Sequence, residues 1–222
     1  MQIKKATEVV SSGVPTAVQL EAINAQAKAK LQAEQVYVFS LRLCDDQVDR
    51  DFERFDTAAL PELAKLFVGK TGIMDHCWSA ENQVARIFET QIVKEQGVSF
   101  IKAWAYIRRG GDNEELIADI EAGIKKEVSV GCAMGRCICS VCGSEYGTCG
   151  HRKGEHYDGQ LCCGILPLPG SQADRPLHPV FTGSCSLQCL QYFLKFRQFK
   201  GCLDDDAIFG NKGHFTNIFF AF

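Results

Sequence analysis

The chain of 222 residues has no run of 18 apolar residues, no excess of basic charge and no visible internal repeat. The first absence excludes a membrane-spanning helix, which needs about 20 apolar residues. The lack of excess basic charge argues against a protein whose main surface binds nucleic acid, because the chain has 24 basic and 27 acidic residues and a net charge of −3. The positively charged start, Met1 to Lys5, is not followed by an apolar stretch, so we expect no secretory signal.

Apolar residues make up 46% of the chain, which suffices for a folded core and excludes a disordered or fibrous protein. We divide the chain into an N-terminal arm and helix (1–35), a central domain (36–165) and an atypical tail (166–222). The tail holds nine of the fifteen phenylalanines but has no helical or strand period. We therefore expect the tail to be poorly ordered.

Hydrophobic periodicity predicts both helices and strands in the central domain. The predicted strands cover 36–43, 84–93, 98–106 and 127–131; the predicted helices cover 57–67 and 112–126; and the charged segment 45–56 is expected to be a loop. Asp112 and Glu115 have the spacing of a capping box at the start of the second helix.

Cysteine is crowded into one segment, because seven of the twelve cysteines lie between residues 132 and 163. Cys139 and Cys142 form a C-x2-C pair, which lets two thiolates bind one ion from a tight turn. Cys149 and His151 can complete a set of three cysteines and one histidine, which is common in closed structural zinc sites. Soft thiolate ligands favour zinc over calcium or magnesium.

Alternatives to this ligand set remain open at the level of sequence. His156 or Cys162 could replace His151 as the fourth ligand. Disulfides, or exposed thiols without a metal, would also account for the cysteines, although a disulfide framework usually belongs to a short secreted chain. We expect a small zinc-binding insertion at about 137–163 that has a structural role, since four protein ligands leave no position for a substrate.

His76 and Ser129 are the candidate catalytic residues. A serine hydroxyl needs a neighbouring base to attack a carbonyl, and an imidazole is the usual base. His76 is the only histidine in the first 150 residues and follows a glycine-flanked turn, while Ser129 lies in a predicted strand. Taken alone, a histidine in a turn and a serine in a strand are more often structural.

The segment from Val36 to about Ile165 resembles the prohead (capsid maturation) proteases of tailed bacteriophages, which are related in fold to the herpesvirus assemblins. The resemblance rests on the order and spacing of its features. These are the first strand and acidic loop, Gly72-Ile73-Met74-Asp75-His76, the hairpin 84–106, the helix 112–126, Glu127-Val128-Ser129-Val130-Gly131, and the Cys/His insertion with Cys139-Ser140-Val141-Cys142-Gly143 and Cys149-Gly150-His151.

This resemblance implies a serine endopeptidase in which Ser129 is the nucleophile and His76 the general base, with no cofactor for the chemistry. Its substrates would be phage scaffold and major capsid proteins, cleaved inside the assembling procapsid in the bacterial cytoplasm, and a homo-oligomer is left open. Together with the predicted elements, it indicates an α+β fold with a mainly antiparallel, barrel-like sheet and flanking helices.

Residues 166–222 depart from the family, whose further strand after the serine region carries a third catalytic member. That departure keeps two other functions open. One is a catalytically inactive, zinc-containing protein of capsid assembly that binds scaffold. The other is a small zinc module that binds nucleic acid, against which the net charge of −3 counts.

Overall fold

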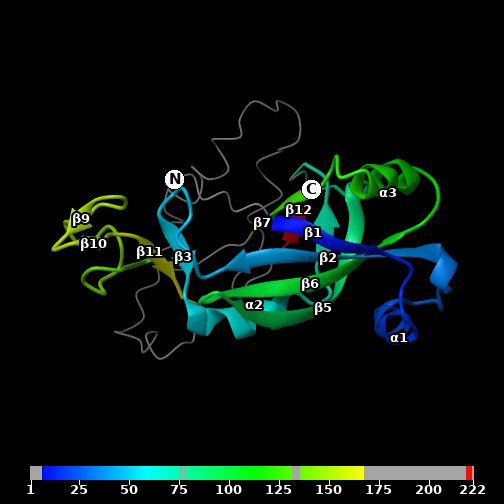
Figure 1. The fold of residues 1–222 in the computed structure, drawn as a ribbon, viewed down its shortest axis with the longest axis horizontal. Helices are drawn as coiled ribbons and strands as arrows, with labels where there is room; N and C mark the ends of the chain where they lie inside the picture. The colour runs from blue at the N-terminus through cyan, green and yellow to red at the C-terminus, as the bar shows by residue number, and fades with distance from the viewer. Residues whose placement is uncertain (1–6, 76, 78, 132–135, 168–218, 222) are drawn as a thin grey trace.

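The structure is a computed structural model that describes residues 7–75, 77, 79–131, 136–167 and 219–221. It has an α+β fold with mainly antiparallel sheets and few helices (Figure 1), as the sequence predicts. None of the helices in these ranges is both long enough and apolar enough to cross a membrane.

Seven strands form the main sheet, in the order β1-β2-β6-β5-β4-β12-β7. Their bounds are β1 (Thr7–Gly13), β2 (Val36–Asp45), β4 (Thr71–Ile73), β5 (Gln83–Glu95), β6 (Val98–Arg108), β7 (Glu127–Gly131) and β12 (Phe219–Ala221). Neighbours are antiparallel except β12 and β4, which are parallel. Strand β1 also pairs with β7, so the last strand in the order returns to the first.

Strand β2 organises the core because both of its faces are buried. Tyr37, Phe39 and Leu41 point to the larger core, which also contains the apolar face of helix α2 (Leu60–Phe67). Val36 and Val38 point the other way, toward Ile23 of helix α1 (Ala17–Gln26). Because side chains alternate between the two faces of a strand, helix α2 packs on one face of β2 and helix α1 on the other.

Local features of the chain fix where helices α1 and α2 begin. In α1, the Thr16 hydroxyl accepts a hydrogen bond from the Gln19 amide, and the Gln19 side chain accepts one from the Thr16 amide. This capping box fixes the start of α1. Two 3-10 turns, η1 (Ala33–Gln35) and η2 (Thr57–Ala59), lead into β2 and α2. Pro61 lies in the first turn of α2, where its missing amide hydrogen has no helical partner to lose.

Helix α3 (Asn113–Glu121) is shorter than the predicted 112–126, and the predicted capping box is wrong. Asp112 has helical backbone angles and makes no side-chain cap. Glu114 instead accepts a hydrogen bond of 2.7 Å from the Gly110 amide, in the turn that precedes the helix. The helix ends before Gly123, whose φ of 70° is the left-handed conformation common just after a helix.

Two further expectations need correction. The segment 45–56 is not wholly a loop, because strand β3 (Glu53–Phe55) lies within it and pairs in parallel with β11 (Gly164–Leu166). The tail, which the sequence predicts to be poorly ordered, contributes Phe219–Ala221 as β12, and this strand lies in the main sheet between β4 and β7. Residues 168–218 and 222 of the predicted tail lie outside the described residues.

Core packing beneath α2 gives a direct test of the fold. Leu63 is fully buried in the larger core, whereas Lys65, two residues on, exposes 71% of its side chain. We expect Leu63→Ala to lower the free energy of unfolding by about 2–5 kcal/mol, because it removes buried methyl groups and leaves a cavity. Chemical denaturation measures this. Lys65→Ala is the control and should cost less than about 1 kcal/mol; equal losses in the two variants would contradict this packing.

Candidate functional site

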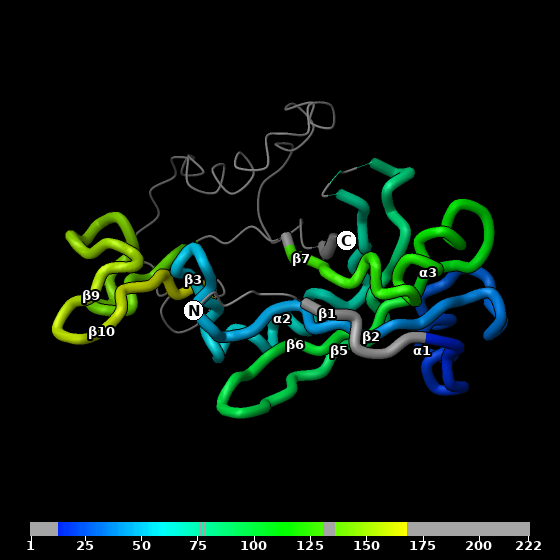
Figure 2. Tube along the Cα trace, turned by 45° about the horizontal axis from the view of Figure 1, so that its top comes forward, coloured from blue at the N-terminus to red at the C-terminus, as the bar shows by residue number. Residues whose placement is uncertain are grey.

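The Cys/His segment forms a small module at the end of the molecule opposite to α1 and α3 (Figures 1 and 2). It consists of β8 (Ile138–Cys139), the hairpin of β9 (His156–Tyr157) and β10 (Gln160–Leu161), and β11. Strand β11 lies between β8 and β3 in a three-stranded sheet. The module is therefore joined to the body through β3.

The four predicted ligands Cys139, Cys142, Cys149 and His151 converge in this module, and we call them the Cys/His cluster. Their ligand atoms all lie within 4.8 Å of one another. The Cys139 Sγ lies 3.6 Å from the His151 Nδ1. A sulfur and a nitrogen bound to one tetrahedral zinc ion, at about 2.3 and 2.1 Å, are also about 3.6 Å apart. The Cys/His cluster can therefore hold a metal ion, whereas His156, which the sequence keeps as an alternative ligand, lies outside the group.

Backbone amides point at the thiol groups. The Cys139 Sγ accepts hydrogen bonds from the amides of Val141 and Cys142, and Gly143 supports the tight turn with a φ of 72°. Burial disfavours the Cys139 thiolate, but these amide donors outweigh burial and lower the pKa of Cys139 to about 7. The Ser144 amide likewise lowers the pKa of Cys142. The lowered pKa of each group in the C-x2-C pair favours the thiolate, the form that binds metal.

The neighbouring cysteines contribute to raising the pKa values of Cys149 and Cys162. The His151 amide lowers the pKa of Cys149, but burial and the neighbouring groups of Cys142 and Cys139 outweigh it and raise the pKa. Burial, followed by the nearby Cys139, raises the pKa of Cys162 to about 11. A cation at the centre of the cluster would relieve the repulsion between thiolates, so metal binding would release protons and stabilise the module.

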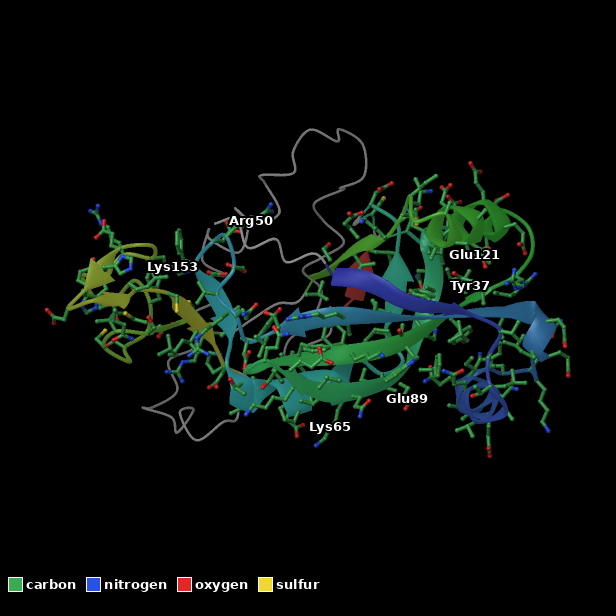
Figure 3. The ribbon with its side chains drawn as sticks, viewed as in Figure 1. Tyr37, Arg50, Lys65, Glu89, Glu121 and Lys153 are labelled. Atoms are coloured by element: carbon green, nitrogen blue, oxygen red, sulfur yellow. The ribbon has the colours of Figure 1, made fainter. Side chains whose placement is uncertain are left out.

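The module docks on the body through three contacts. Strand β11 pairs with β3, and the Gly164 amide donates a hydrogen bond of 2.8 Å to the Phe52 carbonyl. The Lys153 ammonium forms an ion pair with Glu53 of β3, at the junction seen in Figure 3. Gly154 lies against the Phe52 ring so closely that an added Cβ would come within 2.8 Å of it. These contacts fix the module to the segment 49–55.

One part of the module has a sequence signal that the prediction missed. Asp158-Gly159 separates β9 from β10, and both residues have positive φ, of 50° and 81°. A two-residue Asp-Gly loop is a strong hairpin signal. The hairpin carries Tyr157, whose ring packs edge-on against His151 with a centroid distance of 4.4 Å and so orients the imidazole.

The candidate nucleophile Ser129 lies in β7 and is exposed. The candidate base His76 lies outside the described residues. Strand pairing relates Ser129 to the strand that precedes His76: Ser129 is opposite Ala221 of β12, and Ala221 is opposite Ile73 of β4. The sheet therefore brings β7 and the end of β4 to either side of one short strand.

The residues on both sides of position 76 are held in a closed turn. The Cys77 amide donates to the Met74 carbonyl at 2.9 Å, and the Met74 amide donates to the Asn82 carbonyl at 3.1 Å. The Asn82 side chain donates to the Cys77 carbonyl at 3.3 Å. Asp75 is part of this turn and has a φ of 52° and an exposed side chain.

A cavity of ≈ 360 Å³ adjoins this turn. It lies between the start of β5 and the first turns of α3, and its lining includes Met74, Glu81, Val84, Asp112, Glu115 and Leu116. Asn113 and Lys125 complete this lining, so the cavity has apolar, acidic and basic side chains and gives room for a side chain of another molecule beside the turn.

Comparisons of the chain with protein-family models, with curated proteins and with solved structures found no match.

Metal loading tests the cluster. We expect the protein purified from cells to hold one metal ion per chain, and the double variant Cys139→Ser/Cys142→Ser to hold none, because it loses both thiolates of the knuckle. Elemental analysis with protein quantification measures the ratio. Cys137→Ser is the matched control, since Cys137 lies two residues away but outside the cluster, and should keep the ion. Retention of the ion by the double variant would contradict the site.

Proposed function

We propose that this protein is a serine endopeptidase of the phage prohead type, which cleaves scaffold and capsid proteins during capsid maturation in the bacterial cytoplasm. Ser129 is the nucleophile and His76 the general base. The observation that carries the proposal is the register across β7, β12 and β4, which aligns Ser129 with Ile73. Adjacent strands are about 4.8 Å apart, so the two backbones are separated by about 10 Å. His76 follows Ile73 by three residues.

The order of the elements also supports the proposal. A long strand with an acidic segment after it, a short strand before His76, a hairpin, a helix and a short serine-bearing strand follow one another in the order that the resemblance implies. The return of the pairing from β7 to β1 supports a barrel-like sheet. The cavity beside Met74 would supply space for a substrate side chain.

The proposed reaction is hydrolysis of a peptide bond through an acyl-enzyme. The Ser129 Oγ attacks the scissile carbonyl carbon while the imidazole of His76 accepts the hydroxyl proton. The tetrahedral intermediate collapses, the carbon–nitrogen bond breaks, and the imidazolium gives its proton to the leaving amine. A water molecule, deprotonated by the same imidazole, then attacks the ester, and Ser129 is regenerated with its proton.

For the Cys/His cluster we propose a structural zinc ion. Three thiolates and one imidazole are a common closed set for zinc and leave no position for a substrate. The cluster lies in the module at one end of the fold, away from β7 (Figure 2). The zinc ion would supply stability that the short strands of the module cannot obtain from a core of their own. Elemental analysis should identify the bound metal as zinc; iron in its place would overturn this assignment.

Covalent labelling of the serine tests the protease. A fluorophosphonate probe should modify the wild-type protein once, at Ser129, because the probe reacts with serines that an adjacent base activates. Ser129→Ala should abolish labelling, and His76→Ala should slow it by about 100-fold or more. Peptide mapping by mass spectrometry locates the label and also detects self-cleavage.

Ser79→Ala is the control, since Ser79 lies in the turn beyond Cys77 and should label as the wild type does. A folded wild-type protein that never labels, but binds capsid scaffold equally well in all variants, would overturn the protease. That result would favour the catalytically inactive assembly protein.

A further inference from the structure

Cys162 lies next to the Cys/His cluster but is not one of its four members. The Cys162 Sγ lies 3.8 Å from the Cys139 Sγ, and both residues are buried, with 0% and 1% of their surfaces exposed. Two thiolates bound at about 2.3 Å to one tetrahedral zinc ion are also about 3.8 Å apart. Cys162 thus stands at a ligand's distance from one member of the cluster, although it is outside the group of four.

The backbone holds Cys162 in this position. Its amide donates to the Glu155 carbonyl at 2.8 Å, and its carbonyl accepts from the Gly154 amide at 2.9 Å. The next residue, Cys163, exchanges hydrogen bonds with Ser140 of the knuckle: its amide donates to the Ser140 Oγ, and its carbonyl accepts from the Ser140 amide. The two-residue link between β10 and β11 that carries Cys162 is therefore tied both to the 154–155 turn and to the C-x2-C turn.

His151 is held less firmly than Cys162. It is half-buried, with its ring against Tyr157, and it lies in the 149–155 segment, which forms no strand. A buried cysteine that binds no metal needs only a weak hydrogen bond for its thiol. The Cys139 sulfur offers such a bond to Cys162. The Cys162 thiol therefore lies within reach of the cluster in a buried, hydrogen-bonded link, while the half-buried imidazole of His151 can be displaced without breaking a strand.

We propose that Cys162 is a reserve ligand that replaces His151 and converts the site of three cysteines and one histidine into a four-cysteine site. In this exchange the bond between the metal and the His151 nitrogen breaks and a bond between the metal and the Cys162 sulfur forms. The thiol proton passes to the released imidazole, and no electrons are transferred. The proposal rests on the zinc site proposed above and is independent of the protease chemistry.

Cobalt(II) reconstitution tests the exchange, because the intensity of the sulfur-to-cobalt charge-transfer band follows the number of bound thiolates. Wild-type protein should give the band of three thiolates. His151→Ala should still bind one cobalt ion per chain, with the band increased by about a third as a fourth thiolate joins. The double variant His151→Ala/Cys162→Ser should lose that increase and bind cobalt at least about tenfold more weakly than His151→Ala.

Cys163→Ser is the matched control for the neighbouring buried thiol and should leave the His151→Ala spectrum unchanged when combined with it. A band in His151→Ala that stays at three thiolates would overturn the reserve-ligand role. A wild-type band that falls in Cys162→Ser would also overturn it, because Cys162 would then be a resident ligand. A wild-type protein that binds no cobalt would instead remove the metal site itself, so the two failures are distinguishable.

Discussion

The candidate active site depends on one short strand, β12, which pairs with both β4 and β7. Strand β4 has three residues and β7 has five, and β12 is the strand through which the main sheet connects them. The pairing of β12 with β4 and β7 fixes the register in which Ser129 is aligned with Ile73. A shift of one residue in either pairing would move Ser129 along the sheet relative to the turn of residues 74–82.

The sequence predicts the elements whose signal is local. The hairpin of β5 and β6 is confirmed, with its turn at Gln96 and Gly97, because alternating apolar residues and a glycine define it without reference to the rest of the chain. The same holds for the Cys/His cluster, whose C-x2-C turn is stabilised by its own amides. The α+β class and the mainly antiparallel pairing follow from these local patterns.

The features that the sequence does not predict depend on partners far along the chain. Strand β3 has only three residues and gains its order from β11, more than a hundred positions later. Strand β12 lies in an apolar segment without periodicity, so only its neighbours β4 and β7 define it as a strand. At α3, Gly110 and Glu114 override the Asp112–Glu115 spacing, since the backbone already turns into the helix at Asp112. Tertiary contacts decide such cases over local propensity.

The Cys/His cluster and the candidate active site are attached to different parts of the body. Glu53 and Phe52 anchor the module to the segment after β2. Asp46, at the start of this segment, accepts hydrogen bonds from the Ser99 amide and the Thr57 hydroxyl, which ties the segment to β6 and to the turn before α2. The module is thus linked to the end of β2 and the start of β6. Ser129 lies instead in β7, which pairs with β1 and β12. The module therefore stabilises the segment 45–56, which is not among the strands that pair with β7.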